Sequence, residues 1–265
     1  MRMKAIASGS SGNSIYVGTD NTHILIDTGI SKKKIENGLC ELELTGNDIN
    51  ALLVTHEHSD HIGGLGVFLR KYPVNVYATP GTIQGILQSK SIGCIDYSLL
   101  HEIHYDEQFQ IGDIQVTSIK TSHDANEPCA YRFTDGQRSA AVITDLGCYD
   151  DYIINNLKNL DTVFLEANHD VRMLETGPYP YELKKRILGK KGHLSNELGG
   201  RLLGEILNDN MQHVVLSHLS KENNLPYLAY EAVRLEVNMS ERGYNADDFD
   251  ISVASRYDPS PTLVF

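Results

Sequence analysis

Four candidate metal ligands lie within six residues of one another in THEHSDHIGG, residues 55–64. They are His56, His58, Asp60 and His61. The segment follows an apolar run that is typical of a buried strand and leads into an expected helix. Because side chains alternate along a strand, His56 and His58 can point the same way, whereas Asp60 and His61 come where the chain turns. Imidazole and carboxylate donors in this order favour two adjacent divalent ions over a polar surface loop.

Three more potential ligands each follow an expected strand. His123 follows residues 114–120, Asp145 follows 139–144, and His218 follows 213–217. Functional groups collect where strands end at one edge of a sheet. A single histidine in such a place has no special meaning, but three such residues beside the His-rich segment predict one shared metal site.

A carboxylate and a histidine further along the chain could form an acid–base pair. Glu166 ends an expected strand in LEANHD, residues 165–170, and His193 precedes an expected helix in KKGHLSNE, residues 190–197. Glu166 could orient His193, whose imidazolium would protonate a departing oxygen. The alternative is that His193 only belongs to the start of a helix capped near Ser195.

Two stretches could contact phosphate groups. SGSSGNS, residues 8–14, contains Ser10 and Asn13 and could leave backbone N–H groups free for an anion, or be a plain hairpin turn. A basic run precedes His193 and could be a phosphate track or a solvated face; it comprises Lys184, Lys185, Arg186, Lys190 and Lys191. Of these, Lys190 and Lys191 are the substrate candidates, together with Ser195.

Length and composition predict one globular domain over residues 1–265. The chain is 41% hydrophobic and 22% charged, which is ordinary for a soluble protein. No apolar run approaches the ~20 residues that span a bilayer, and the start does not resemble a secretory signal. A net charge of −12 argues against a protein wrapped in nucleic acid, although metal ions would restore positive charge at a nuclease site.

The four cysteines are far apart and form no CxxC pair. They are therefore expected to be free thiols in the cytoplasm.

Short β-branched runs alternate with helical patterns along the chain. Strands are expected at 14–18, 23–27, 51–55, 74–78, 100–104, 108–111, 114–120, 129–134, 139–144, 162–166, 213–217 and 249–254. Helices are expected at 62–71, 80–90, 149–157, 168–175, 180–188, 195–208 and 226–239. This order favours an α+β protein with two sheets face to face and helices outside.

The pattern HxHxDH, with distant His123, Asp145 and His218 and with Asp27 upstream in ILIDTG, resembles the metallo-β-lactamase-like superfamily. The resemblance implies an αββα sandwich of two mixed sheets. It implies one metal held by His56, His58 and His123, and another held by Asp60, His61 and His218. Asp145 would bridge the two, and a hydroxide between them would be the nucleophile. Asp27 would brace the His-rich segment from behind, and Asp60 would serve catalysis as well as ligation.

Longer motifs are similar to those of the YycJ/WalJ group of bacterial nucleases within this superfamily. They are SGSSGN, THEHSDHIGGLGV, SHDANEP, LEANHD, KGHLSNE and LSHLSKENN, within residues 4–238. The resemblance implies a 5′→3′ exonuclease and phosphodiesterase acting on DNA, more than on RNA, with Glu166 and His193 as its dyad. Zinc and manganese both suit the donors, and iron would be accepted.

Two other classes of function fit the same residues. A small-molecule hydrolase, such as a thioesterase, lactonase or cyclic phosphodiesterase, could use the same ligands without His193 or the lysines. A non-catalytic regulator of a signalling system would need the ligands for stability alone. The oligomeric state does not follow from the sequence.

Overall fold

The computed structural model describes all 265 residues, which form two compact units. The first comprises Met1–Lys120, Ala125–Gln137 and Ser255–Phe265. The second comprises Thr121–Asp124 and Arg138–Ala254. No helix in either unit has the length and apolar character needed to cross a membrane. That residues 1–265 act as one domain stays a prediction.

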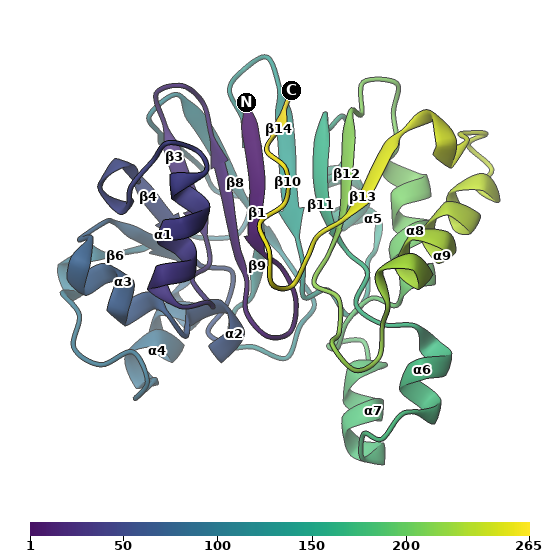
Figure 1. Ribbon diagram of the computed structural model, residues 1–265, viewed down its shortest axis with the longest axis horizontal. Coiled ribbons are helices and arrows are strands. Elements are labelled where there is room, and N and C mark those ends of the chain that lie inside the picture. The colour runs from purple at the N-terminus through teal and green to yellow at the C-terminus, as the bar shows by residue number, and fades with distance from the viewer. The chain divides into compact units, whose positions relative to one another are not determined.

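The first unit is built on a mixed sheet of seven strands, shown in Figure 1. Their order is β14 (Leu263–Val264), β1 (Arg2–Ala7), β2 (Ser14–Gly18), β3 (His23–Ile26), β4 (Ala51–Leu53), β5 (Val76–Ala78) and β6 (Leu100–Glu102). Pairing is antiparallel from β14 to β3 and parallel from β3 to β6. The same unit contains the antiparallel strands β7 (Gln108–Ile111), β8 (Ile114–Lys120) and β9 (Cys129–Thr134).

Helices cover one side of the seven-stranded sheet and close a hydrophobic core. They are α1 (Lys32–Cys40), α2 (Ser59–Ile62), α3 (Leu65–Lys71) and α4 (Pro80–Gln88). Leu25 and Leu52 are cross-strand partners on β3 and β4 and belong to one buried cluster with Ile35 of α1 and Phe68 of α3. The short 3₁₀ helices of this unit are Gly46–Asp48 and Tyr97–Leu99. This packing holds the end of β4, from which the His-rich segment emerges.

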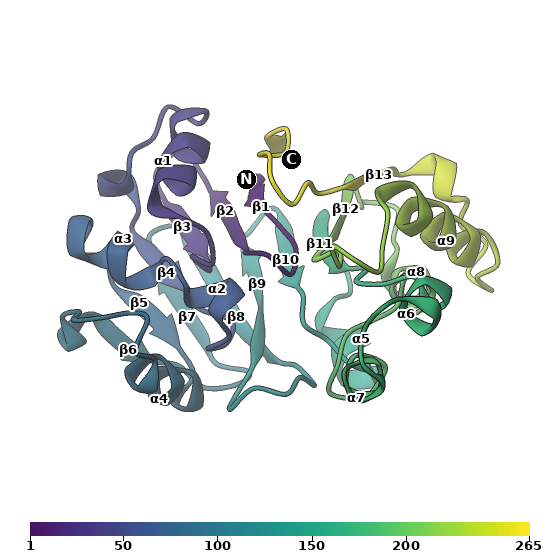
Figure 2. The same ribbon diagram turned by 60° about the horizontal axis from the view of Figure 1, so that its bottom comes forward.

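The second unit contains four parallel strands: β10 (Ser139–Ile143), β11 (Thr162–Glu166), β12 (His213–Ser217) and β13 (Asp250–Val253). Its helices are α5 (Asp151–Asn156), α6 (Val171–Thr176), α7 (Tyr181–Ile187), α8 (Asn196–Ile206) and α9 (Pro226–Asn238), with a 3₁₀ turn at Ala246–Asp248. Figure 2 shows α8 and α9 side by side. All of β11 is buried, as expected for a central parallel strand.

Most expected elements are present, and the exceptions have long-range causes. Three elements were not expected from the sequence: β1, α1 and β14. The tail strand β14 exists because it pairs with β1, placing Met3 opposite Leu263. The single helix expected at 62–71 was wrong, since α2 ends at Ile62 and α3 begins at Leu65. At the break, a Cβ on Gly64 would lie 2.1 Å from the Ile30 carbonyl oxygen. All four cysteines are free, as predicted.

Gly29 allows the loop after β3 to pack against the backbone of the His-rich segment. A Cβ on Gly29 would lie 1.6 Å from the carbonyl oxygen of Asp60. We therefore expect Gly29→Ala to destabilise the protein by about 1–3 kcal/mol, because backbone must shift to admit the methyl group. The melting temperature should fall by several degrees. The exposed Lys33→Ala in α1 should change stability by less than ~0.5 kcal/mol. Equal melting temperatures for both variants would contradict the close packing at Gly29.

Candidate metal centre and acid–base pair

The His-rich segment of the first unit brings its ligand atoms together in pairs. Nε2 of His56 lies 3.0 Å from Nδ1 of His58. Oδ2 of Asp60 lies 3.5 Å from Nε2 of His61. His56 and His61 are buried, whereas Asp60 is partly exposed. The segment thus offers two convergent donor pairs, each suited to one divalent ion.

Asp27 holds this segment from behind. Its Oδ2 accepts hydrogen bonds from His61 Nδ1 at 2.7 Å and from Thr55 Oγ1 at 2.8 Å. Its Oδ1 accepts from the Thr55 backbone N–H at 2.9 Å. Because Nδ1 of His61 is engaged by a carboxylate, ligation by this ring falls to Nε2. Asp27 is 2% exposed, so it has no access to solvent that could replace these partners.

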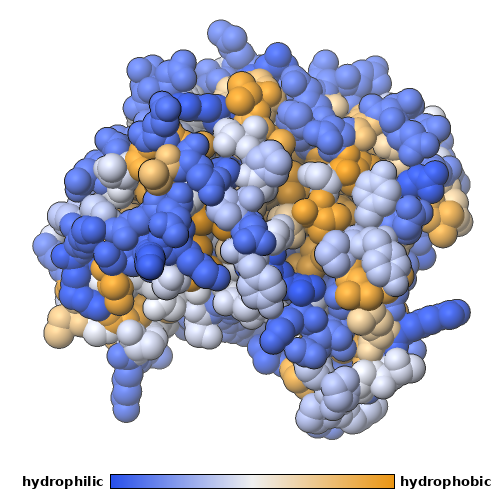
Figure 3. Space-filling model, viewed as in Figure 1, coloured by the Kyte–Doolittle hydropathy of each residue, from blue (hydrophilic) through white to orange (hydrophobic).

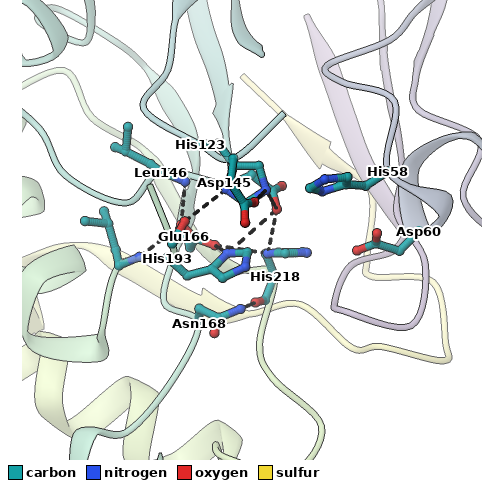
Figure 4. A network of polar contacts seen from close by, with 12 residues as sticks. His58, Asp60, His123, Asp145, Leu146, Glu166, Asn168, His193 and His218 are labelled. Atoms are coloured by element: carbon teal, nitrogen blue, oxygen red, sulfur yellow. Dashed lines mark hydrogen bonds and ion pairs between the residues drawn. The ribbon is translucent and has the colours of Figure 1, made fainter. Parts of the chain in front are cut away.

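The second unit gathers the three predicted ligands that follow strands. Oδ1 of Asp145 lies 3.8 Å from Nε2 of His123 and 3.5 Å from Nδ1 of His218 (Figure 4). His123 donates from Nδ1 to the carbonyl of Gly192 at 3.0 Å, which leaves Nε2 directed at the carboxylate. Burial lowers the pKa of His123, so its ring is kept neutral, as a ligand must be.

Glu166, at the end of β11, connects the acid–base pair to this cluster. Its Oε1 accepts from Nδ1 of His193 at 2.8 Å and from Nδ1 of His218 at 3.0 Å. Its Oε2 accepts from the backbone N–H groups of Leu146 at 2.8 Å and Leu194 at 3.2 Å. Burial alone would raise the pKa of Glu166, but His193 and His218 outweigh it and the pKa is lowered. The carboxylate is therefore ionised and fully hydrogen-bonded.

His193 is the more accessible partner of this pair. Its side chain is about one-fifth exposed, whereas that of Glu166 is fully buried. Since Glu166 engages Nδ1, a proton that His193 donates to another molecule has to leave from Nε2. The imidazole that remains keeps its Nδ1 proton on the carboxylate.

The predicted phosphate contacts divide into two groups. Ser10, Lys190 and Lys191 are exposed. Asn13 is buried and committed to its own unit: its Oδ1 accepts from the Gly9 N–H, and its Nδ2 lies 3.3 Å from Asp60 O and 3.1 Å from His61 Nε2. Ser195 is also buried, and its Oγ caps α8 by accepting from the Leu198 N–H. Asn13 and Ser195 thus brace the local structure.

Sequence reasoning missed Asp124 and His169. Asp124 Oδ1 lies 3.4 Å from Nε2 of His123, and Oδ2 accepts from Nε of Arg186. Its position directly after His123 was the available signal. His169 is 1% exposed, and burial lowers its pKa to about 4. Arg186, which the sequence placed in a basic run, is therefore held by an acidic partner.

The donor atoms in each unit fit divalent metal ions. Neutral imidazoles and carboxylates are the ligands that zinc, manganese and iron accept. Partners within each unit engage Nδ1 of His61, His123 and His218, so Nε2 is the ring nitrogen left for ligation. On His61 a metal ion would take the place of the contact between Nε2 and Asn13 Nδ2. In the second unit, one possible ligand atom from each of Asp145, Glu166, His193 and His218 lies within 4.8 Å of the others.

Comparison with known proteins agrees with these observations. A family model described as "Beta-lactamase superfamily domain" matches residues 22–218. The chain is 41% identical over 256 residues to "Exodeoxyribonuclease WalJ" of Streptococcus pneumoniae, covering 97% of this chain and 93% of that protein. It is 39% identical over 250 residues to "Exodeoxyribonuclease YycJ" of Bacillus anthracis, covering 94% and 92%.

Solved structures confirm the α+β fold class, an αββα sandwich. The metallo-beta-lactamase fold protein YhfI from Bacillus subtilis has a TM-score of 0.68 at 17% identity and covers 98% of both chains. Human tRNase Z, short form, has a TM-score of 0.67 at 14% identity over the full length of both chains. At these identities the likeness shows the fold alone.

Replacing Asp27 tests whether it orients His61 for a metal ion. Asp27→Asn keeps the shape of the side chain but removes the charge that favours a proton on Nδ1 of His61. We expect zinc affinity to fall by roughly 10–100-fold, as is typical when such a partner is lost, with competition against a chromogenic chelator as the measurement. Asp113→Asn is the control, because Asp113 is exposed and bonded to Thr19 in the same unit. Unchanged affinity in Asp27→Asn would refute the role of this carboxylate.

Proposed function

We propose that this chain, which belongs to the beta-lactamase superfamily and within it to the WalJ/YycJ family, is a metal-dependent exodeoxyribonuclease. The observation that carries the proposal is the buried Glu166 carboxylate, which holds both His193 and His218 by Nδ1. Glu166 therefore links His193, which can give a proton to a leaving oxygen, to His218, a predicted metal ligand. The relatives' printed names supply the substrate, DNA.

The proposed site uses two divalent ions, and residues 1–265 form one hydrolase domain. The match of a single family model to residues 22–218 supports one domain. One ion would be held by His56, His58 and His123, and the other by Asp60, His61 and His218. Asp145 would bridge them; in support, its Oδ1 lies 3.8 Å from Nε2 of His123, the nitrogen that this ring presents for ligation. Zinc and manganese are the preferred ions, and the same donors accept iron.

Bound ions would supply an activated water molecule and neutralise the charge of a phosphodiester. The chain's own residues then serve the leaving group. Glu166 stays ionised and keeps a proton on Nδ1 of His193. His193 releases the proton of Nε2 to the departing deoxyribose oxygen, which would otherwise leave as a strongly basic alkoxide. Asp60, which lies beside His61, would both bind one of the ions and take part in the hydrolysis.

The finer parts of the proposal are DNA in preference to RNA, 5′→3′ polarity and action in the cytoplasm. The first is supported by the names of the relatives, and the second by the resemblance of the motifs. Four free cysteines suit a reducing compartment. A thioesterase, a lactonase or a non-catalytic regulator would not need the pairing of Glu166 with His193, so we favour the nuclease.

Metal analysis distinguishes a bridging ligand from a terminal one. We expect Asp145→Ala to lose about two metal equivalents and nearly all hydrolysis, because a bridge contacts both ions. His218→Ala should lose mainly one. Elemental analysis after gel filtration measures both. Two tightly bound equivalents in Asp145→Ala would rule out the bridging assignment.

Leaving groups distinguish a general acid from a structural histidine. DNA hydrolysis should fall by roughly 10²–10⁴-fold in His193→Ala, whereas bis(p-nitrophenyl) phosphate should be largely spared because p-nitrophenolate leaves without a proton. Glu166→Gln should act in the same direction and, through His218, should also weaken metal binding. Rate measurements with both substrates, at matched metal content, provide the test.

The matched control is His213→Ala, which breaks another histidine–carboxylate pair, His213 with Asp250 at 2.7 Å. It should leave both rates unchanged. If His193→Ala slowed both substrates equally or lost metal, His193 would be a ligand or a structural residue.

A further inference from the structure

Helix α7, together with its C-cap residue Leu188, carries an exposed stripe. Tyr181 is 74% exposed and Leu188 is 47% exposed, with the exposed Lys185 between them. Residues spaced by four and then three positions lie on one side of a helix. We call Tyr181, Lys185 and Leu188 the α7 stripe. In Figure 3 the end of this unit formed by α6 and α7 presents pale and orange side chains beside blue ones.

The charge around the stripe is opposite to that of the whole chain. Residues 181–193 contain five lysines and arginines and one acid, Glu182, in a protein of net charge −12. Two of the five cations are engaged: Arg186 bonds to Asp124, and Nζ of Lys184 donates to the Glu175 carbonyl. Lys185, Lys190 and Lys191 are exposed. Aromatic rings close to exposed lysine or arginine side chains are the combination that binds single-stranded nucleic acid.

The stripe is firmly connected to the acid–base pair. The His193 N–H donates to the Ile187 carbonyl at 3.0 Å, closing the loop between α7 and His193. The Lys190 carbonyl accepts from Ser122 Oγ at 2.8 Å, and the Gly192 carbonyl accepts from His123 Nδ1 at 3.0 Å. A Cβ on Gly192 would lie 2.0 Å from the Ile187 carbonyl oxygen, so the turn is tight.

The hydrogen-bonded turn also limits the distance between the α7 stripe and His193. The backbone N–H of His193 lies 3.0 Å from the carbonyl oxygen of Ile187, and Tyr181 precedes Ile187 by six residues in the same helix, about 9 Å along its axis. The backbone of Tyr181 is therefore within about 15 Å of that of His193, which is about four nucleotides along a strand at the ~3.4 Å rise of B-DNA, and fewer for a more extended strand. A strand whose scissile phosphate lies beside His193 can therefore reach the stripe with its next few nucleotides.

We propose that the α7 stripe binds one strand of the DNA substrate beside the cleaved phosphate, with Tyr181 stacking on an unpaired base. Lys185, Lys190 and Lys191 contact the phosphates that flank it. This inference rests on the proposed nuclease function and adds a requirement for a single-stranded end. Inside a duplex every base already stacks on its neighbours, so a duplex without ends offers Tyr181 no free face. A protein partner at the same stripe is the competing outcome.

Binding to a non-cleavable strand tests the stripe independently of turnover. The probe is a fluorescent single-stranded oligonucleotide with phosphorothioate linkages, measured by anisotropy with the metal-loaded protein. Stacking on an aromatic ring is worth ~1–3 kcal/mol per base, so Tyr181→Ala should raise Kd by roughly 5–150-fold. Tyr181→Phe, which keeps the ring, should bind as the wild type does. Tyr227→Ala is the matched control, since Tyr227 is 63% exposed on α9.

Salt and substrate type separate stacking from charge. Lys185→Ala should reduce the log–log salt slope of single-strand binding by ~0.7, whereas Tyr181→Ala should leave the slope unchanged. Both variants should hydrolyse bis(p-nitrophenyl) phosphate at the wild-type rate. Affinity for a closed circular duplex should not respond to Tyr181→Ala.

Single-strand affinity that is unchanged in Tyr181→Ala, or equally reduced in Tyr181→Phe, would overturn the stripe proposal. So would a wild-type protein that binds no single strand, the result expected if the stripe serves a protein partner. A wild type that binds the strand through Tyr181 but hydrolyses no DNA would overturn the nuclease proposal instead. The two failures are thus distinguishable.

Discussion

The buried carboxylate of Glu166 is the constraint on which the second unit depends. A charge removed from water is tolerated only when its oxygens are paired, and here two imidazoles and two backbone N–H groups provide the partners. The same four contacts fix the turn after Asp145, the segment around His193 and the ring of His218. One requirement of electrostatics therefore positions the acid–base pair and a metal ligand together.

In the first unit Asp27 is likewise a buried carboxylate whose oxygens are paired. Its carboxylate accepts hydrogen bonds from the Thr55 backbone N–H and from Nδ1 of His61, so the ring proton of His61 stays on Nδ1. Asp27, Asp145 and His218 also adopt left-handed backbone conformations, with φ of 60°, 59° and 57°. Such conformations cost about 1–3 kcal/mol each in residues other than glycine and persist only where surrounding contacts impose them. Stability is thus given up at three positions to aim functional side chains.

The charge distribution complements this arrangement. The protein as a whole repels phosphate, but acidic ligands are compatible with a nucleic-acid substrate when divalent ions neutralise them. The remaining attraction is local, in the exposed lysines between α7 and His193. Because Asp124 holds Arg186 and a carbonyl of α6 holds Lys184, part of the basic run anchors structure, and the other lysines are available to a ligand.

The sequence by itself determined the fold class, the family, most strands and helices, and the identity of the candidate ligands, because these depend on local patterns and short spacings. The segment THEHSDH contains four candidate ligands within six residues, and the ends of the expected strands predict where the other three lie. Only the tertiary structure decided which atoms those residues use. It committed Asn13 and Ser195 to local bracing, paired Asp124 with Arg186, joined Glu166 to His218 as well as to His193, and created β14 beside β1. Each of these contacts joins groups whose partner is set by packing in three dimensions, and no local spacing encodes such a choice.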